Sequence, residues 1–463
     1  MKVNPFDKLR IDAECHRSIN PTIFKSYDIR GIFPSEIDEE SAEQIGKLFI
    51  NCTGAKKVVV GRDMRLSSPL LFDSLVKGIT EQGADVYDMG QVPTECLYFA
   101  VGKYDYDAGI IITASHNPKE YNGFKMIKKD IDEFSMIRGK DLLGFLSENQ
   151  VTKTNKKGRL ENIRILEEYL DYVFSKINTA DLKPFKVVID AGNGMAGKVI
   201  PLIEKRLPIE IVPLNFKLDG NFPAHPSNPL EKGVTDQLQK AVKKEKADFG
   251  LIFDGDADRI FLIDDLGNFI QGDITLLLLA NHILKENPGA VIAYNTICSK
   301  AVPELIKKWG GKPIRTPVGF VNVREALIKN KGLMGGELSG HYCFKDNFYG
   351  DSSVIAFLIL LNFLSQSNKK VSEIITDFSP YVKSSEINFK VEDKESVLAK
   401  IKEKHKDAKQ DYLDGVTVEY DDWWFNIRPS NTEPLLRLTI EAKTKELLGE
   451  KKKELSALIE NLK

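Results

Sequence analysis

Near its middle the chain reads Leu251-Ile252-Phe253-Asp254-Gly255-Asp256-Ala257-Asp258-Arg259-Ile260-Phe261-Leu262-Ile263, an acidic loop between two apolar runs. The aliphatic and aromatic residues on either side predict two strands. Alternate side chains of an extended segment point to the same side. We therefore expect Asp254, Asp256 and Asp258 to face one hard cation, with Arg259 beside them.

The spacing of these carboxylates also imitates a calcium-binding loop, with Asp265 at its twelfth position. Such a loop needs glycine at its sixth position, where this chain has Arg259, and it needs flanking helices instead of strands. Mg²⁺ suits the loop better, because it takes few carboxylates and accepts a phosphate oxygen in its shell.

A second polar loop offers a hydroxyl that could carry a phosphate. It reads Thr113-Ala114-Ser115-His116-Asn117-Pro118 and follows the apolar run 109–112. Most serines in such turns only bond the local backbone, and no GxSxG elbow surrounds Ser115 to indicate a hydrolase. Together, a phosphorylatable hydroxyl and a carboxylate site for a divalent ion are the two halves of a phosphoryl-transfer centre.

The residues after this loop, Tyr121-Asn122-Gly123-Phe124-Lys125, predict a tight turn into a strand. That turn would bring Lys125 back towards the serine. On its own, Lys125 is equally well interpreted as a solvated lysine of a hairpin.

Length and composition indicate a globular protein of three or four domains. The chain has 463 residues, of which 42% are hydrophobic and 29% charged. A net charge of -2 argues against general nucleic-acid binding. The five cysteines form no CxxC pair, so we expect neither disulfides nor zinc, and a reducing cytoplasm as the location. The longest apolar run, 354–361, is too short to span a membrane and predicts a buried helix.

Short apolar runs recur along the chain, for example at 58–60, 187–189 and 291–294, each before a helical pattern. Strands alternating with helices predict α/β domains with mainly parallel sheets. Residues 192–197 fit the pattern GxGxxG, but the next strand does not end in the acidic residue that a ribose would need. We interpret these glycines as sites of close packing.

Polar breaks at 152–158 and 366–370, together with the turn at 264–267, suggest where the domains begin and end. The predicted limits are 1–157, 158–263, 264–370 and 371–463. The break at 366–370 is also expected to act as a hinge for the last domain.

Two further loops carry groups suited to a phosphosugar. Arg428-Pro429-Ser430-Asn431-Thr432 offers a guanidinium, two hydroxyls and an amide, which suit a phosphate monoester. Gly335-Gly336-Glu337-Leu338-Ser339-Gly340-His341 offers an acceptor, a hydroxyl and an imidazole for sugar hydroxyls. Taken alone, the first is also an ordinary polar turn.

The order of these four loops resembles the α-D-phosphohexomutase superfamily, most closely its bacterial and archaeal phosphomannomutase/phosphoglucomutase branch. Further motifs carry the likeness over nearly the whole chain: Phe24-Lys25-Ser26-Tyr27-Asp28-Ile29-Arg30-Gly31, Gly61-Arg62-Asp63, Asp219-Gly220-Asn221-Phe222-Pro223 and Phe344-Lys345-Asp346. The resemblance implies four domains around a central cleft: three α/β domains of shared topology and a smaller C-terminal α+β domain.

The resemblance also implies a mechanism. A phosphoserine enzyme would interconvert hexose 1-phosphate and hexose 6-phosphate, of mannose and/or glucose, through a hexose 1,6-bisphosphate intermediate. Mg²⁺ would be held by Ser115, Asp254, Asp256 and Asp258. The implied catalytic residues are Ser115, Lys125, His341, Arg259 and Arg30. The implied substrate-binding residues are Glu337, Ser339, His341, Arg428, Ser430, Asn431 and Thr432.

Three positions bear on the choice of substrate. Close relatives carry lysine in place of Ile297 and often histidine in place of Phe320. Phosphoglucosamine mutases typically have glutamine in place of Leu338, so that activity is the alternative. A non-catalytic phosphosugar-binding protein is a further alternative, against which the intact Ser115 and acidic loop argue. The expected partner is a small phosphosugar, with no nucleic acid or membrane, and the expected state is a monomer or a small homo-oligomer.

Overall fold

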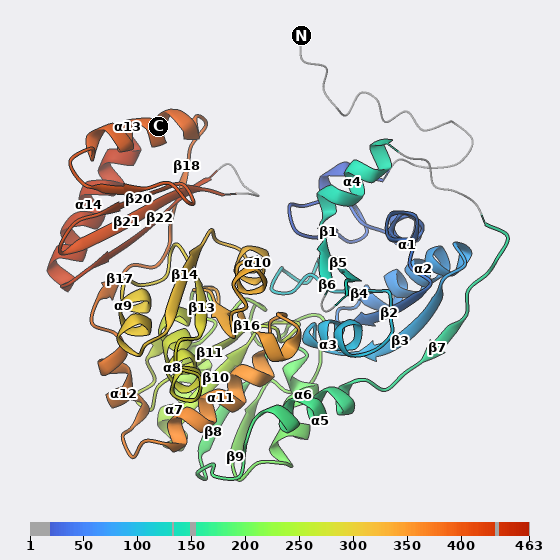
Figure 1. Ribbon diagram of the computed structural model, residues 1–463, viewed down its shortest axis with the longest axis horizontal. Coiled ribbons are helices and arrows are strands. Elements are labelled where there is room, and N and C mark those ends of the chain that lie inside the picture. Colours follow the sequence, from blue (N-terminus) through green and yellow to red (C-terminus); the bar gives the residue numbers. More distant parts are fainter. Residues whose placement is uncertain (1–18, 132–133, 149–153, 431–434, 463) are drawn as a thin grey trace.

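The computed structural model describes residues 19–131, 134–148, 154–430 and 435–462, which form four units, each with its own sheet (Figure 1). The first sheet has the strand order β1-β5-β4-β2-β3-β7, with β6 added beside β5. Its strands are β1 (Ile29–Ile32), β2 (Lys57–Arg62), β3 (Asp85–Gln91), β4 (Ala108–Ile112), β5 (Tyr121–Lys129), β6 (Phe134–Ile137) and β7 (Leu160–Asn162). Its helices are α1 (Glu39–Thr53), α2 (Ser68–Glu81), α3 (Glu95–Lys103) and α4 (Gly139–Glu148).

The second and third sheets have the orders β12-β11-β10-β8-β9 and β14-β13-β15-β16. The second unit contains β8 (Lys186–Asp190), β9 (Glu210–Leu214), β10 (Phe249–Phe253), β11 (Ile260–Ile263), β12 (Phe269–Ile270), α5 (Leu166–Lys176), α6 (Ala196–Glu204) and α7 (Asp236–Glu245). The third contains β13 (Val291–Asn295), β14 (Lys312–Thr316), β15 (Met334–Gly336), β16 (Tyr342–Phe344), α8 (Gly272–Glu286), α9 (Ala301–Lys308), α10 (Phe320–Asn330), α11 (Ser353–Ser365) and α12 (Val371–Phe378).

The fourth unit has an antiparallel sheet of order β17-β22-β21-β20-β19, with β18 beside β22. It contains β17 (Val382–Lys383), β18 (Ile387–Lys390), β19 (Lys409–Asp411), β20 (Val416–Glu419), β21 (Trp423–Pro429), β22 (Leu435–Ala442), α13 (Lys394–Lys404) and α14 (Lys445–Leu462). Two helices and an antiparallel sheet make this unit α+β, as the resemblance implies.

The first three units share one topology. In each, a central strand (β2, β8 or β13) pairs in parallel with the next two strands, one on either side. A fourth strand then returns antiparallel to the third, in the pairs β4–β5, β10–β11 and β15–β16. The serine loop (113–118), the acidic loop (254–259) and the Glu337 loop (335–341) therefore occupy equivalent positions in the three units, between the third strand and the fourth. The α/β fold class and the shared topology are confirmed.

The prediction of a tight turn at residues 121–125 was wrong. These residues already lie in β5, and Lys125 pairs with Ile111 of β4. The sequence Asn122-Gly123 normally signals a hairpin turn, but here it meets β1. A Cβ at Gly123 would lie 2.0 Å from the carbonyl oxygen of Ile29, so glycine lets the two strands approach.

The units extend further along the chain than the polar breaks indicate. The strand β7 follows the predicted limit at 157 but pairs with β3, and β12 follows the limit at 263 but pairs with β11. Helix α12 follows the limit at 370, and its Phe378 packs against Trp309 and Phe363 of the third unit. Composition marks exposed turns, whereas pairing depends on partners that are remote in sequence.

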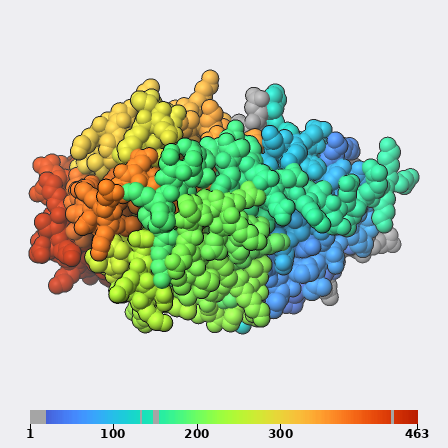
Figure 2. Space-filling view, turned by 90° about the horizontal axis from the view of Figure 1, so that it is seen from below, coloured from blue at the N-terminus to red at the C-terminus, as the bar shows by residue number. Residues whose placement is uncertain are grey.

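The hydrophobic core explains which unit stands apart. One continuous cluster joins the first three units and includes Leu97, Leu170, Ile189 and Phe357. The fourth unit has its own cluster, which includes Phe425. Figure 2 shows the fourth unit, in red, at the opposite end of the molecule from the first. A unit with a separate core can shift relative to its neighbours more easily than one that shares a core.

The apolar run 354–361 lies in α11, as predicted. Ser352 caps this helix by accepting a hydrogen bond from the amide of Ile355. Almost all of its 13 residues are buried, which explains a sequence without a polar face. In the described part of the chain, no helix is both long and apolar enough to cross a membrane.

Candidate active site

The equivalent turns of the first two units meet at Ser115. Its backbone has φ +49° and its side chain is buried, with the amide bonded to Thr113 Oγ1 at 2.8 Å. The hydroxyl donates to Asp254 Oδ2 at 3.0 Å, across the boundary between the units. A Cβ at Gly255 would lie 2.7 Å from the carbonyl oxygen of Ser115, so glycine permits this close approach.

The three aspartates of the acidic loop are buried and lie together. One carboxylate oxygen from each of Asp254, Asp256 and Asp258 falls within 4.8 Å of the others. Asp256 Oδ1 and Asp258 Oδ1 have no hydrogen-bond partner among the described residues, although His341 Nδ1 lies 3.7 Å from Asp258 Oδ1. Buried carboxylate oxygens without a hydrogen bond are costly. These two oxygens therefore fit a hard divalent cation such as Mg²⁺. The flanking strands β10 and β11 also exclude the helix–loop–helix calcium site.

Two basic side chains neutralise part of this acidic cluster. Lys125 Nζ lies 2.8 Å from Asp256 Oδ2 and 2.5 Å from Asp258 Oδ2, and Arg259 Nε lies 2.9 Å from Asp254 Oδ2. Burial opposes the charge of Lys125, but the two carboxylates outweigh burial and raise the pKa of this lysine. Arg259 Nη2 is buried without a hydrogen-bond partner among the described residues, so it is available to a phosphate.

His341 comes from the equivalent turn of the third unit. The backbones of Arg259 and His341 form an isolated antiparallel bridge. His341 Nδ1 lies 2.8 Å from Asp351 Oδ2 and 3.7 Å from Asp258 Oδ1. Burial lowers the pKa of this imidazole, but Asp258 and Asp351 outweigh that effect and raise it to about 9. The two carboxylates thus favour the cationic form of His341.

Arg30 supports the serine loop from β1. Its Nε pairs with Asp28 at 2.7 Å, and its Nη1 donates to the carbonyl oxygen of Ala114 at 3.1 Å and to the Asn117 side chain. The structure thus brings together seven of the predicted residues, namely Ser115, Lys125, Asp254, Asp256, Asp258, Arg259 and His341, and it places Arg30 against the same loop.

Sequence reasoning missed Arg65, which binds the backbone of the serine loop. This fully buried arginine donates through Nη2 to the carbonyl oxygens of Ser115 at 2.8 Å and Asn117 at 2.6 Å. Its Nη1 donates to those of Pro118 at 2.7 Å and Tyr121 at 3.0 Å. The sequence does not show which backbone carbonyl groups a side chain will bind. The nearby motif Gly61-Arg62-Asp63 was the only signal.

Replacing this arginine should loosen the serine loop. Arg65→Met removes the donor to four carbonyl groups and leaves Asp63, its fully buried ion-pair partner at 3.2 Å, without a counter-charge, so we expect the free energy of unfolding to fall by about 3–5 kcal/mol. Thermal unfolding compared with Arg62→Met, which removes a partly exposed pair with Asp88, measures the difference. Equal shifts in the two variants would contradict this account of Arg65.

The Glu337 loop lies on the third unit. Glu337 Oε1 accepts hydrogen bonds from Asn295 Nδ2 at 3.0 Å and from the amide of Gly319 at 2.7 Å. Ser339 Oγ donates to Glu337 Oε2 at 3.2 Å. These bonds fix the orientation of a buried carboxylate.

Arg428 and Ser430 stand where β21 of the fourth unit ends. Arg428 Nη2 pairs with Glu386 Oε2 at 2.8 Å, while its Nε is buried without a partner among the described residues. The amide of Ser430 bonds to the carbonyl oxygen of Leu435 at 2.8 Å. The predicted residues Asn431 and Thr432 lie outside the described residues.

Comparisons with known proteins match all four units of the chain. Family models of the phosphoglucomutase/phosphomannomutase α/β/α domains I, II and III match residues 21–135, 167–267 and 271–381, and the model of the C-terminal domain matches 386–458. A phosphomannomutase of Methanocaldococcus jannaschii is 39% identical over 95% of this chain and 98% of its own. One from Escherichia coli K12 is 36% identical over 91% and 95%.

A solved phosphoglucomutase/phosphomannomutase family protein of Burkholderia thailandensis is 31% identical. The match covers 96% of this chain and 98% of that chain, with a TM-score of 0.87. The chain belongs to the phosphoglucomutase/phosphomannomutase family of phosphohexomutases, which are enzymes of the isomerase class.

Proposed function

We propose that this protein interconverts the 1-phosphate and the 6-phosphate of mannose and/or glucose through a phosphoserine at position 115. The observation that carries the proposal is the position of Ser115 Oγ, which lies 3.0 Å from Asp254 in a cluster of three buried carboxylates. A phosphoryl group on this hydroxyl would sit where the acidic loop and Arg259 converge.

The transfer balances as follows. A sugar hydroxyl attacks phosphorus, the bond from phosphorus to Ser115 Oγ breaks, and a hexose 1,6-bisphosphate forms. One proton passes, in net, from the sugar hydroxyl to Ser115 Oγ, because the cationic group that protonates the serine regains its proton from the sugar. After the bisphosphate has reversed its orientation in the site, its other phosphate is transferred to Ser115 by the reverse step. We propose that Lys125 and His341, both held cationic by carboxylates, supply the proton and stabilise negative charge.

Charge at the site favours a divalent cation. Three carboxylates face Lys125 and Arg259, and a phosphoserine adds a charge of about -1.5 to -2. We propose that Ser115, Asp254, Asp256 and Asp258 hold Mg²⁺. When bound, the ion offsets the negative charge of the phosphoryl group and orients it for transfer.

Both ends of the sugar must reach one reaction centre, so the other phosphate needs a clamp that accepts either orientation. We propose Arg428 and Ser430, with Asn431 and Thr432, for this clamp. Arg428 Nε is buried without a partner among the described residues, which leaves a donor for a phosphate oxygen. On the third unit, Glu337, Ser339 and His341 would contact the sugar hydroxyls.

Removing the clamp should impair both directions of the reaction. The clamp binds whichever phosphate is not reacting, so Arg428→Ala should lose about 1.5–3 kcal/mol of transition-state binding. The expected fall in kcat/KM is about one to two orders of magnitude with either phosphate as substrate. More bisphosphate should also leave the enzyme between the half-reactions, which ³¹P NMR measures. Arg437→Ala, which removes the other arginine paired with Glu386, is the matched control.

Parallel assays test the proposal as a whole. Purified enzyme with Mg²⁺ and a trace of hexose 1,6-bisphosphate is given mannose 1-phosphate, glucose 1-phosphate or glucosamine 1-phosphate. We expect 6-phosphate from mannose, glucose or both. Conversion of glucosamine 1-phosphate alone would establish phosphoglucosamine mutase instead, and binding without conversion would indicate a phosphosugar-binding protein.

A further inference from the structure

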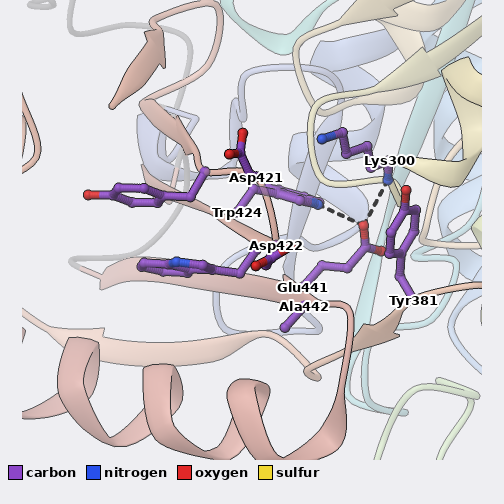
Figure 3. Close-up of a pocket in the computed structure, with 9 residues that line it drawn as sticks. Lys300, Tyr381, Asp421, Asp422, Trp424, Glu441 and Ala442 are labelled. Carbon is purple, nitrogen blue, oxygen red and sulfur yellow. Dashed lines mark hydrogen bonds between the residues drawn. The ribbon is translucent and has the colours of Figure 1, made fainter. Parts of the chain in front are cut away.

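The fourth unit docks on the third at several places, which include the hydrogen bond from Arg315 Nη2 of β14 to Thr417 Oγ1 of β20 at 3.0 Å. The first of two further places lies beside β17, where the chain enters the fourth unit. There Glu441 Oε1 accepts hydrogen bonds from the amide of Lys300 at 2.9 Å and from Trp424 Nε1 at 2.7 Å (Figure 3). A buried ion pair joins Lys383 of β17 to Asp273 of α8 at 2.6 Å. We name these five residues the pivot contact.

The pivot contact lies on a different stretch of chain from the expected hinge. The polar break at 366–370 is tied to the second unit, because Lys183 Nζ donates to the carbonyl oxygen of Ser367 and to Asn368 Oδ1. Helix α12 then packs on the third unit. The fourth unit therefore starts to separate from the third only after α12, at β17.

The second docking place is Asp414, in the turn between β19 and β20. Its Oδ2 accepts hydrogen bonds from the amide of Val318 at 2.9 Å and from Thr296 Oγ1 at 3.4 Å, both on the third unit. No residue of the pivot contact takes part in these bonds. Asp414 thus makes its own connection to the loop between β14 and α10.

The same turn is fixed to the proposed phosphate clamp. The carbonyl oxygen of Asp414 accepts a hydrogen bond from Asn426 Nδ2 of β21 at 2.9 Å. A Cβ at the next residue, Gly415, would lie 2.6 Å from the Cα of Arg428. Asp414 and Arg428 therefore move together when the fourth unit moves.

On the third unit, the peptide that Asp414 binds leads directly to Glu337. The amide of Val318 bonds to Asp414, and the next amide, that of Gly319, bonds to Glu337 Oε1 at 2.7 Å. Gly319 has φ +125°, a conformation that side chains disfavour. A Cβ there would lie 3.0 Å from the hydroxyl oxygen of Tyr27, so the first unit touches this loop as well.

We propose that Asp414 is a positioning residue that couples docking of the phosphate-binding unit to the orientation of Glu337. This inference rests on the proposed function, in which Arg428 holds the distal phosphate and Glu337 contacts the sugar. When phosphate draws the fourth unit onto the third, Asp414 orders the Val318–Gly319 peptide. The ordered peptide then holds Glu337 in position through the amide of Gly319. Closure of the fourth unit onto the third is thereby coupled to recognition of the sugar by Glu337.

A double-mutant cycle tests this coupling. Asp414→Ala and Glu337→Ala are each expected to lower kcat/KM by at least about tenfold, and Glu337→Ala removes the acceptor of the Gly319 amide. Because both act through one peptide, the double variant should lose much less than the product of the two effects. Asp421→Asn removes an exposed carboxylate from another turn of the same sheet and is the control. Its effect should be small and should multiply with that of Glu337→Ala. Losses that multiply for Asp414 and Glu337 would overturn the proposal.

A second measurement does not depend on catalysis. Hydrogen exchange of peptides containing Val318 and Gly319 should be about tenfold faster in Asp414→Ala than in wild type. Asp414→Asn keeps an acceptor of the same shape and should restore most of the protection and of the activity. Unchanged exchange in Asp414→Ala, or no rescue by asparagine, would also overturn the proposal. A wild-type enzyme without mutase activity would refute the proposed function, whereas the exchange result would still report on Asp414.

Discussion

Ser115→Ala is expected to reduce kcat/KM by at least about a thousandfold, because an enzyme that loses its nucleophile has no substitute for it. The loss should be the same with mannose and glucose phosphates, since in the proposed mechanism one serine serves both ends of either sugar. The fold should survive, because the change removes one hydroxyl whose main described partners are Asp254 and the adjacent His116. Steady-state kinetics and thermal unfolding measure the two effects separately.

Ser227→Ala is the matched control for this variant. Ser227 is also buried, and its hydroxyl donates to the carbonyl oxygen of Asn117 at 3.1 Å, in the serine loop itself. This hydroxyl bonds a backbone carbonyl oxygen and not a carboxylate of the acidic cluster, so its removal should cost less than about tenfold in kcat/KM. Intact mass and peptide mapping should place a phosphate on Ser115 of active enzyme. Full activity in Ser115→Ala would exclude the phosphoserine mechanism.

Removal of divalent ions is expected to lower the rate by at least about a hundredfold, with recovery on adding Mg²⁺. The physical reason is that three buried carboxylates and a phosphoserine would repel one another, and the basic side chains of Lys125, Arg259 and His341 would not balance them. Asp256→Asn should cause a loss of similar size even at saturating Mg²⁺. In wild type, Mg²⁺ should raise the unfolding temperature, and Asp256→Asn should abolish that shift.

The control for the metal prediction is Asp265→Asn. Asp265 would be the last ligand of a calcium loop, but in the structure it caps the amide of Ser372 at 2.8 Å. We expect the Mg²⁺ dependence of this variant to match that of wild type. A rate that does not change after thorough chelation would show that the acidic loop serves some other purpose.

Sequence alone was enough wherever the decisive signal was local. Alternating carboxylates between two apolar runs predict a strand, a cation-binding loop and a second strand, because side-chain direction in extended chain has a period of two. The strands and the loop lie where that pattern indicates. The glycines of 192–197 also pack closely as expected, since a Cβ at Gly197 would lie 2.0 Å from the carbonyl oxygen of Phe216.

Tertiary structure decided what depends on partners remote in sequence. Asn122-Gly123 favours a turn in an isolated peptide. In the folded protein these residues belong to β5, because they pair with β1. Arg65 and Asp414 lie in loops with no motif of their own, and their partners include backbone groups more than fifty residues away. A backbone carbonyl or amide is the same in every residue, so the sequence cannot show which side chain will bind it. The sequence determined the chemistry of this site, and the long-range packing of four units determined which groups hold it in place.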